Sequence, residues 1–309
     1  MGLTQLGAVE IERIARRVLQ SNGVTVEREH AGFGNENWKV RDSSGSRYVL
    51  KVADRGNEAK WRSSHAAYGL AAAAGVPVPE LAHVGEYQDH LVRIFTWIDG
   101  LPATDVARDP ARRSRLLRSL GEAVRTLHSV QRGGFSSRLD GSAPLFPTWK
   151  GYMEYRLEQI RVRCEATRAV DDGLLNKVCL AASDLAAEVN DSAEAVLCHR
   201  DLHPGNLIVD ADGTLIGIVD WDAAEAWDSA GDWFKLEFDL LRLCPEGENT
   251  LLAAYFDGDE IPPKWAQRRR LVHLVEALNI LPNAISQMWD KSFADRARRH
   301  LIDLSSAAR

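Results

Sequence analysis

The sequence predicts an α+β protein in two unequal parts, a strand-rich part over residues 1–98 and a mostly helical part over 99–309. Three observations predict this division. Short apolar runs with strand-like composition fill 24–98, around a single long helical pattern. Apolar residues at helical spacing dominate the remainder of the chain. Within that remainder, the dipeptide Asp212-Gly213 between two apolar runs predicts a β-hairpin.

Length and composition agree with a folded chain of one or two domains. The 309 residues carry a formal charge of −6, which argues against a nucleic-acid binder. The four cysteines show no CxxC or Cys/His spacing, so neither a disulfide framework nor a zinc site is expected. The first 20 residues have the pattern of an amphipathic helix rather than of a signal peptide, and no apolar run of 18 residues follows. We therefore expect a cytoplasmic protein without a membrane or nucleic-acid partner, and composition gives no indication of its oligomeric state.

Five strands and one main helix are predicted in the first part. The expected strands are 24–31, 37–41, 47–53, 81–86 and 90–98, and the expected helix is 57–74. The turn after the first strand contains Gly32 and Gly34, whose backbone amides can approach a phosphate without side-chain obstruction. An ordinary hairpin turn is the alternative.

Lys51 interrupts the apolar run YVLKVA. A lysine in a buried strand needs an anionic partner, unless it lies at an edge and reaches solvent. Glu58 is the only acidic residue of the following helical pattern and is therefore the candidate partner. Its position at the helix start offers a second explanation, because carboxylates are favoured there by the helix dipole.

The predicted hairpin brings together polar residues. If Asp212 and Gly213 are the two central residues of the turn, Asn206 pairs with Val219 and lies roughly 5 Å from the backbone of Asp220. Amide and carboxylate oxygens suit Mg²⁺, and Asp201 remains available to accept the proton of a hydroxyl. The pattern predicts a phosphotransfer site, with Asn206 and Asp220 as metal ligands and Asp201 as the catalytic residue. Turn capping by these residues is the alternative.

The stretches HRDLHPGN at 199–206 and IVDWDAA at 218–224 resemble the aminoglycoside phosphotransferase family. That family typically has a His-x-Asp-Leu-His-x-x-Asn loop and an Ile-Asp-Trp or Val-Asp-Trp strand. Arg200 departs from a common glycine, and Asp222 completes an Asp-Trp-Asp triplet in place of an Asp-Phe-Gly-like one. The resemblance implies a bilobal protein-kinase-like fold: a nucleotide-binding N-lobe over 1–98, with a five-stranded antiparallel sheet and one main helix, and a mostly helical catalytic C-lobe over 99–309.

The resemblance also implies roles for individual residues. The phosphoryl donor is ATP with Mg²⁺, and GTP is not excluded. Lys51 contacts the nucleotide phosphates and pairs with Glu58. His199 braces the metal-binding strand, Asp232 supports the catalytic loop, and His203 either packs under that loop or contacts substrate. The remaining nucleotide contacts fall on a phosphate loop and a hinge, namely Gly32, Phe33, Gly34 and Asn35, and Thr96, Trp97 and Ile98.

The stretch 220–260 carries twelve acidic residues and only two basic ones. This surplus predicts either a solvated acidic surface or a negative pocket that attracts a cation. In the second interpretation the substrate contacts are Asp222, Glu225, Asp228 and Trp227, with tryptophan faces packing on sugar rings or cationic groups.

Together these observations predict an ATP-dependent O-phosphotransferase. The expected acceptor is a hydroxyl of a small cationic antibiotic, an aminoglycoside or a basic cyclic peptide of the viomycin and capreomycin type, so that the enzyme confers resistance. The alternative is a metabolite kinase of the same fold, acting on choline, ethanolamine, homoserine or a sugar. A protein kinase is disfavoured because no Ala-Pro-Glu motif follows Asp220. A binding module without activity is disfavoured because Lys51, Asp201, Asn206 and Asp220 are all present.

Overall fold

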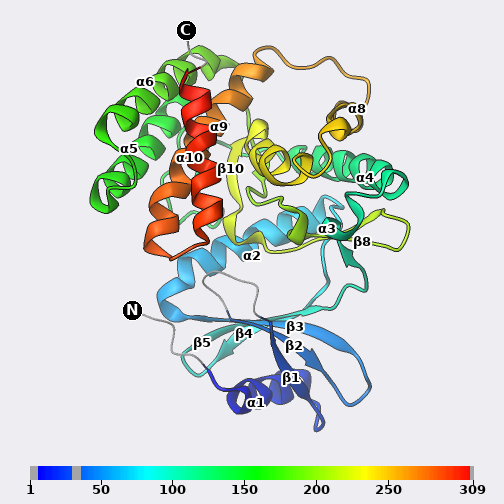
Figure 1. The fold of residues 1–309 in the computed structure, drawn as a ribbon. Helices are drawn as coiled ribbons and strands as arrows, with labels where there is room; N and C mark the ends of the chain where they lie inside the picture. The colour runs from blue at the N-terminus through cyan, green and yellow to red at the C-terminus, as the bar shows by residue number, and fades with distance from the viewer. Residues whose placement is uncertain (1–5, 30–35, 307–309) are drawn as a thin grey trace.

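The computed structural model describes residues 6–29 and 36–306 and shows two lobes (Figure 1). The smaller lobe is built on a five-stranded sheet of order β1-β2-β3-β5-β4, in which every neighbouring pair is antiparallel. Its strands are β1 (Thr25–Glu29), β2 (Glu36–Arg41), β3 (Arg47–Asp54), β4 (Leu81–Tyr87) and β5 (His90–Thr96). The predicted α+β fold class and the five strands of the first lobe are confirmed, with boundaries shifted by one or two residues.

Two helices pack against this sheet. They are α1 (Ala8–Leu19) and α2 (Glu58–Ala73). Ile11 and Ile14 of α1 pack with Leu50 and Ile94 of the sheet. The other helix, α2, lies between the sheet and the larger lobe (Figure 1), and its Tyr68 belongs to the larger core. Helix α2 is therefore placed to carry side chains across the boundary between the lobes.

The chain enters the larger lobe directly after β5. The short strand β6 (Leu101–Pro102) pairs with β8 (Leu207–Val209), which pairs in turn with β9 (Leu215–Ile218). A Cβ atom at Gly100 would lie 2.5 Å from the carbonyl oxygen of Val209, so only glycine fits this crossing. The segment between β5 and β6 includes residues 98 and 99, between which the sequence analysis places the lobe boundary.

The hairpin β8–β9 keeps the predicted register at its site end. The N–H of Val219 donates to the carbonyl of Asn206 at 3.0 Å. Towards the turn an irregularity between Ile208 and Val209 shifts the register, so the expected two-residue turn is wrong. The side chain of Asp210 accepts from the N–H groups of Asp212 and Thr214, each at 2.9 Å, and stabilises a wider turn.

The larger lobe is mostly helical, as predicted. Its main helices are α3 (Ala103–Val106), α4 (Pro110–His128), α5 (Trp149–Thr167), α6 (Asp172–Val189), α8 (Glu248–Phe256), α9 (Trp265–Ser286) and α10 (Lys291–Ser306). Pro282 lies inside α9, which continues past it to Ser286. In the described part of the chain, no helix is long and apolar enough to span a membrane.

The segment after the hairpin is not a single continuous helix. A strand β10 (Glu225–Asp228) first pairs antiparallel with β7 (Ala195–Cys198). A 3₁₀ turn, the short helix α7 (Trp233–Lys235) and a π-helix (Leu236–Leu241) follow. π-Helical turns re-aim side chains and occur often at functional sites.

Candidate active site

The catalytic loop, residues 199–206, is anchored by the buried carboxylate of Asp232. This side chain is fully inaccessible to solvent and accepts the backbone N–H groups of His199 and Arg200. The ring Nε2 of His128, at the end of α4, lies 3.0 Å from the same carboxylate. Burial acts to raise the pKa of Asp232, but the hydrogen bond and charge of His128 outweigh it and hold the pKa below its ordinary value. The loop is therefore tied to an ionised anchor.

His128 is a residue of the candidate site that the sequence did not reveal. Nothing in its sequence neighbourhood points to Asp232. Potential ligand atoms of His128, Cys198 and Asp232 lie within 4.8 Å of one another, which is close enough for a metal ion. The donors on Asp232 explain the cluster without one, and burial raises the pKa of the Cys198 thiol well above its ordinary value.

His199 links the loop 199–206 to the chain just before Asp220. Its Nε2 lies 3.0 Å from the carbonyl of Val219, and its Nδ1 accepts the N–H of Asp201 at 3.2 Å. Burial lowers the pKa of His199 and favours the neutral ring, which can donate through one nitrogen and accept through the other. These contacts are those that a bracing role requires.

Arg200 has a left-handed backbone with φ of 69°. Such a conformation costs a residue other than glycine roughly 1–2 kcal/mol. The guanidinium is buried, lies 3.1 Å from the centre of the Trp227 ring and donates to Glu276 at 2.7 Å. The positive φ explains why glycine suits this position. With arginine there instead, the buried contacts with Trp227 and Glu276 compensate for the backbone cost.

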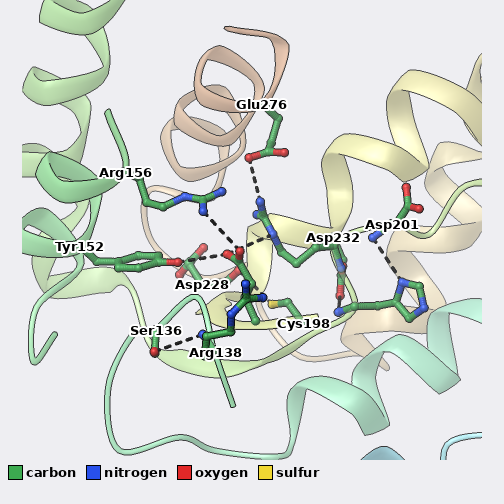
Figure 2. A network of polar contacts seen from close by, with 12 residues as sticks. Ser136, Arg138, Tyr152, Arg156, Cys198, Asp201, Asp228, Asp232 and Glu276 are labelled. Carbon is green, nitrogen blue, oxygen red and sulfur yellow. Dashed lines mark hydrogen bonds and ion pairs between the residues drawn. The ribbon is translucent and has the colours of Figure 1, made fainter. Parts of the chain in front are cut away.

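A second set of charges surrounds this arginine. Tyr152 and Arg156 approach the network from one side and Glu276 from another (Figure 2). The hydroxyl of Tyr152 and the guanidinium of Arg156 donate to Glu225 at 3.0 and 3.3 Å. Arg200 itself lies 4.0 Å from the same carboxylate. The floor of the catalytic loop is therefore a network of buried ion pairs.

Asp201, Asn206 and Asp220 converge as the hairpin predicted. The amide of Asn206 donates to the carbonyl of Asp201 at 2.9 Å and to its carboxylate at 3.3 Å, which leaves the Asn206 oxygen for a cation. Asp220 has a left-handed backbone with φ of 64° and accepts from the ammonium of Lys51 at 2.7 Å. These hard oxygen donors fit Mg²⁺.

Lys51 and Asp220 form an ion pair across the two lobes. Burial acts to raise the pKa of Asp220, but the charge of Lys51 lowers it below its ordinary value. Burial acts conversely to lower the pKa of Lys51, but Asp220 and Asp222 raise it. Both side chains therefore stay ionised in the cleft.

Lys235 is a second residue that the sequence did not assign. Its ammonium lies 3.3 Å from the carboxylate of Asp201 and 3.7 Å from that of Asp239. Burial acts to raise the pKa of Asp201, but Lys235 is the strongest influence that lowers it, and the pKa falls below its ordinary value. In the sequence Lys235 stands out only as one of two cations in an acidic stretch.

A cavity of about 350 Å³ separates the lobes and is lined by both. Its walls include Lys51, Thr96, Trp97, Ile98, Asn206 and Asp220. The N–H groups of Thr96 and Trp97, in the expected hinge, donate to the carbonyls of Glu80 and Arg47. The expected phosphate loop, Gly32 to Asn35, lies outside the described residues.

The expected ion pair between Lys51 and Glu58 is not formed. The carboxylate of Glu58 accepts from Arg62, one helical turn further along α2, at 2.7 Å, and both side chains are exposed. Glu58 is the first residue of α2, whereas it is Ser64 and Tyr68 of α2 that line the cavity. The helix phase and the favourable dipole at its N-terminus explain the position of Glu58.

The residues expected at the acceptor are mostly turned into the protein. Trp227 is fully buried, and Asp228, also fully buried, accepts two hydrogen bonds from Arg268 at 3.0 and 2.6 Å. Glu225 belongs to the network beneath the catalytic loop, and Asp222 accepts from Ser64 at 2.7 Å. The prediction that these side chains form an open acidic pocket is therefore wrong.

His203, also expected near the acceptor, is more exposed to solvent than Trp227 and Asp228. Its Nδ1 accepts the N–H of Gly205 at 3.1 Å, and its Nε2 lies 3.9 Å from the carboxylate of Asp201. The side chain is about a third exposed. His203 therefore shapes the loop and presents one ring edge beside the catalytic carboxylate.

The two lobes, and the cleft between them, have the architecture of kinase-like phosphotransferases. A family model, that of the phosphotransferase enzyme family APH, matches residues 25–271. The chain therefore belongs to this family, and its members are small-molecule phosphotransferases. No curated protein sequence matches the chain significantly.

Several solved structures share the fold. Aminoglycoside phosphotransferase APH(4)-Ia is 20% identical with a TM-score of 0.73, over 98% of this chain and 100% of that chain. A putative fructosamine-3-kinase from Thermobifida fusca YX-ER1 is 17% identical with a TM-score of 0.73, over 98% and 99%. Macrolide 2′-phosphotransferase MphH from Brachybacterium faecium is 18% identical with a TM-score of 0.61, over 95% and 97%.

A thermostable APH(4)-Ia mutant has also been solved as a ternary complex with AMP-PNP and hygromycin B. It is 18% identical with a TM-score of 0.74, over 97% of this chain and 99% of that chain. At these identities the neighbours show the fold.

Because Glu58 pairs with exposed Arg62 and Lys51 pairs with Asp220, Glu58→Gln should leave nucleotide binding unchanged. We expect the KM for ATP to stay within about twofold and the free energy of unfolding to change by less than about 0.5 kcal/mol. Steady-state kinetics and urea unfolding measure both quantities, with Lys51→Met as the variant that should lose ATP affinity. A rise in KM for Glu58→Gln comparable to that of Lys51→Met would show that the expected pair forms after all.

Proposed function

We propose that this chain transfers the terminal phosphoryl group of ATP to a hydroxyl of a small molecule. The observation that carries the proposal is that Lys51, Asn206 and Asp220 line one cleft and that the carboxylate of Asp201 contacts Asn206 beside it. Phosphoryl transfer depends on positioning and on charge stabilisation, and this arrangement supplies both.

Each residue has a separate part in the proposed reaction. Lys51 binds the nucleotide phosphates, while the oxygens of Asn206 and Asp220 hold Mg²⁺. The metal, when bound, neutralises charge on the phosphates. Asp201 accepts a hydrogen bond from the acceptor hydroxyl and takes up its proton as the oxygen attacks. Because Asp201 orients the acceptor directly, no phosphorylated enzyme intermediate is required.

Lys235 holds the catalytic carboxylate in place. Its ammonium contacts Asp201 from the side of α7, while Asn206 contacts Asp201 from its own loop. The carboxylate is thus fixed between a cation and an amide. An oriented carboxylate lowers the entropy cost of meeting the hydroxyl.

We propose a cationic antibiotic as the preferred class of acceptor. Support comes from the fold shared with APH(4)-Ia, which has been solved with hygromycin B. The carboxylates of Asp222, Glu225 and Asp228 lend no support, because each has a partner inside the protein. The alternative, a metabolite kinase, is supported by the fructosamine-3-kinase neighbours.

The assigned roles of Asp201 and Asp220 separate binding from turnover. Asp201→Ala should keep the affinity for ATP·Mg²⁺ within a few-fold and lower turnover by about 10²–10⁴-fold. Asp220→Ala and the matched Asp220→Asn should both lose metal-dependent nucleotide binding. Calorimetric titration and ADP release measure the two effects. Wild-type affinity in both Asp220 variants would contradict the metal role.

The positioning of Asp201 by Lys235 predicts a loss confined to turnover. Lys235→Met should lower kcat by about tenfold with an unchanged KM for ATP, because one charge-assisted contact to the carboxylate is lost. Lys235→Arg should recover part of this loss. Lys150→Met, at an exposed lysine on α5, is the matched control. Equal kinetics for Lys235→Met and the control would exclude the role.

The acceptor class is tested by an ADP-release screen over hydroxylated antibiotics and the metabolites named above. A polycationic acceptor attracted by the acidic protein should show a KM that rises with ionic strength, while the KM for ATP changes little. If the acceptor is an antibiotic, cells that express the chain should become less susceptible to it. A best acceptor that is neutral or anionic would favour the metabolite kinase and leave the phosphotransfer chemistry intact.

A further inference from the structure

The cleft holds an unusual pair of buried cations. Lys51 on β3 and Arg93 on β5 are directly opposite each other in the antiparallel register. Residues that pair in this way project on the same face of a sheet, and like charges there are destabilising. Both side chains line the cavity between the lobes. Such a pair persists only where anions compensate for it.

Arg93 has almost no exposure to solvent, and its partners are largely uncharged. Its guanidinium packs 3.8 Å from the centre of the Trp61 ring and donates to the carbonyl of Trp61 and to the hydroxyl of Ser64, the latter at 3.1 Å. Its Nε has no hydrogen-bond partner among the described residues. Burial lowers the pKa of Arg93 to about 10, and Asp222 is the charge that opposes this.

Asp222 is connected to this pair of cations through Ser64, which also contacts Arg93, and Arg93 lies opposite Lys51 in the strand register. The charge of Asp222 acts against the lowering of both pKa values by burial. Its own position is fixed by Ser64 of α2, which donates to Asp222 at 2.7 Å and accepts from Arg93. Because Ser64 belongs to the N-lobe and Asp222 to the C-lobe, the contact Arg93–Ser64–Asp222 crosses the boundary between the lobes.

Asp220 has two roles in the candidate site, one toward Lys51 and one toward the metal. In this structure it pairs with Lys51, whereas the proposed reaction requires its oxygens for the metal. Glu58 is engaged elsewhere and cannot replace it. We propose that Asp222, held by Ser64 and Arg93, is the positioning residue for Lys51 and takes the place of a helix glutamate. This inference rests on the proposed function and names the residue that keeps Lys51 in the phosphate site.

The test separates charge from hydrogen bonding at position 222. Asp222→Asn keeps an oxygen that accepts from Ser64 but removes the charge. We expect its affinity for ATP·Mg²⁺ to fall by at least about tenfold, because Lys51 loses the carboxylate that holds its ammonium in the phosphate site. Its affinity for adenosine, which lacks phosphates, should not change. Calorimetry with ATP·Mg²⁺ and with adenosine measures the difference.

An exchange variant provides the rescue. In Ser64→Asp/Asp222→Ser the carboxylate moves to α2 but remains beside Arg93 and Lys51, so ATP affinity should return to within a few-fold of wild type. Asp212→Asn, at an exposed aspartate of the hairpin turn, is the matched control and should bind like wild type.

The possible results are distinct. Wild-type protein that does not bind ATP·Mg²⁺ would overturn the proposed function itself. If wild-type protein binds ATP·Mg²⁺ and Asp222→Asn binds it equally tightly, only the role of Asp222 is overturned. The same holds if Asp222→Asn loses as much affinity for adenosine as for ATP·Mg²⁺. It also holds if the exchange variant folds but does not recover ATP affinity. If Asp222→Asn does not fold, Ser64→Ala decides: weaker ATP binding with unchanged adenosine binding supports the proposal, and unchanged ATP binding contradicts it.

Discussion

The catalytic loop depends on one buried interaction, the carboxylate of Asp232 with the backbone N–H groups of His199 and Arg200. A carboxylate without solvent contact is costly unless several donors satisfy it, and here two amides and His128 do so. The amides belong to the two residues just before Asp201, so the anchor determines where the catalytic side chain begins. Through His199, which contacts the carbonyl of Val219, the same anchor also fixes the strand that ends at Asp220.

Charge balance between the lobes imposes a second constraint. The N-lobe contributes the buried cations Lys51 and Arg93, and the C-lobe contributes Asp220 and Asp222. The contacts Lys51–Asp220 and Arg93–Ser64–Asp222 therefore join charges of the two lobes across the cleft. Helix α2 makes this possible because it packs into the larger core while it faces the sheet of the smaller lobe.

The parts of the site that the sequence could predict are close together along the chain. Asp201, Asn206 and Asp220 follow from a strand, a turn and a register, all within about 20 residues, and Lys51 follows from its apolar strand. His128, Lys235 and Arg93 could not be predicted because distant elements bring them to the site. The predicted pairing of Lys51 with Glu58 was wrong for a related reason, because tertiary packing decides which face of a helix meets the cleft. The acidic stretch 220–260 suggested an open negative pocket because composition counts charges without showing their partners. Asp228, for example, pairs with Arg268 inside the protein.

The two departures from the family motif follow one physical rule. Arg200 replaces a glycine in a left-handed position, and Glu276 on distant α9 neutralises its guanidinium. Asp222 completes the Asp-Trp-Asp triplet, and Ser64 on α2 holds its carboxylate next to Arg93. A charge placed in a buried loop survives only with a compensating group, and that group lies on whichever element packs against the loop. A departure of this kind therefore carries structural information, because it requires a partner elsewhere in the fold that the motif alone does not name.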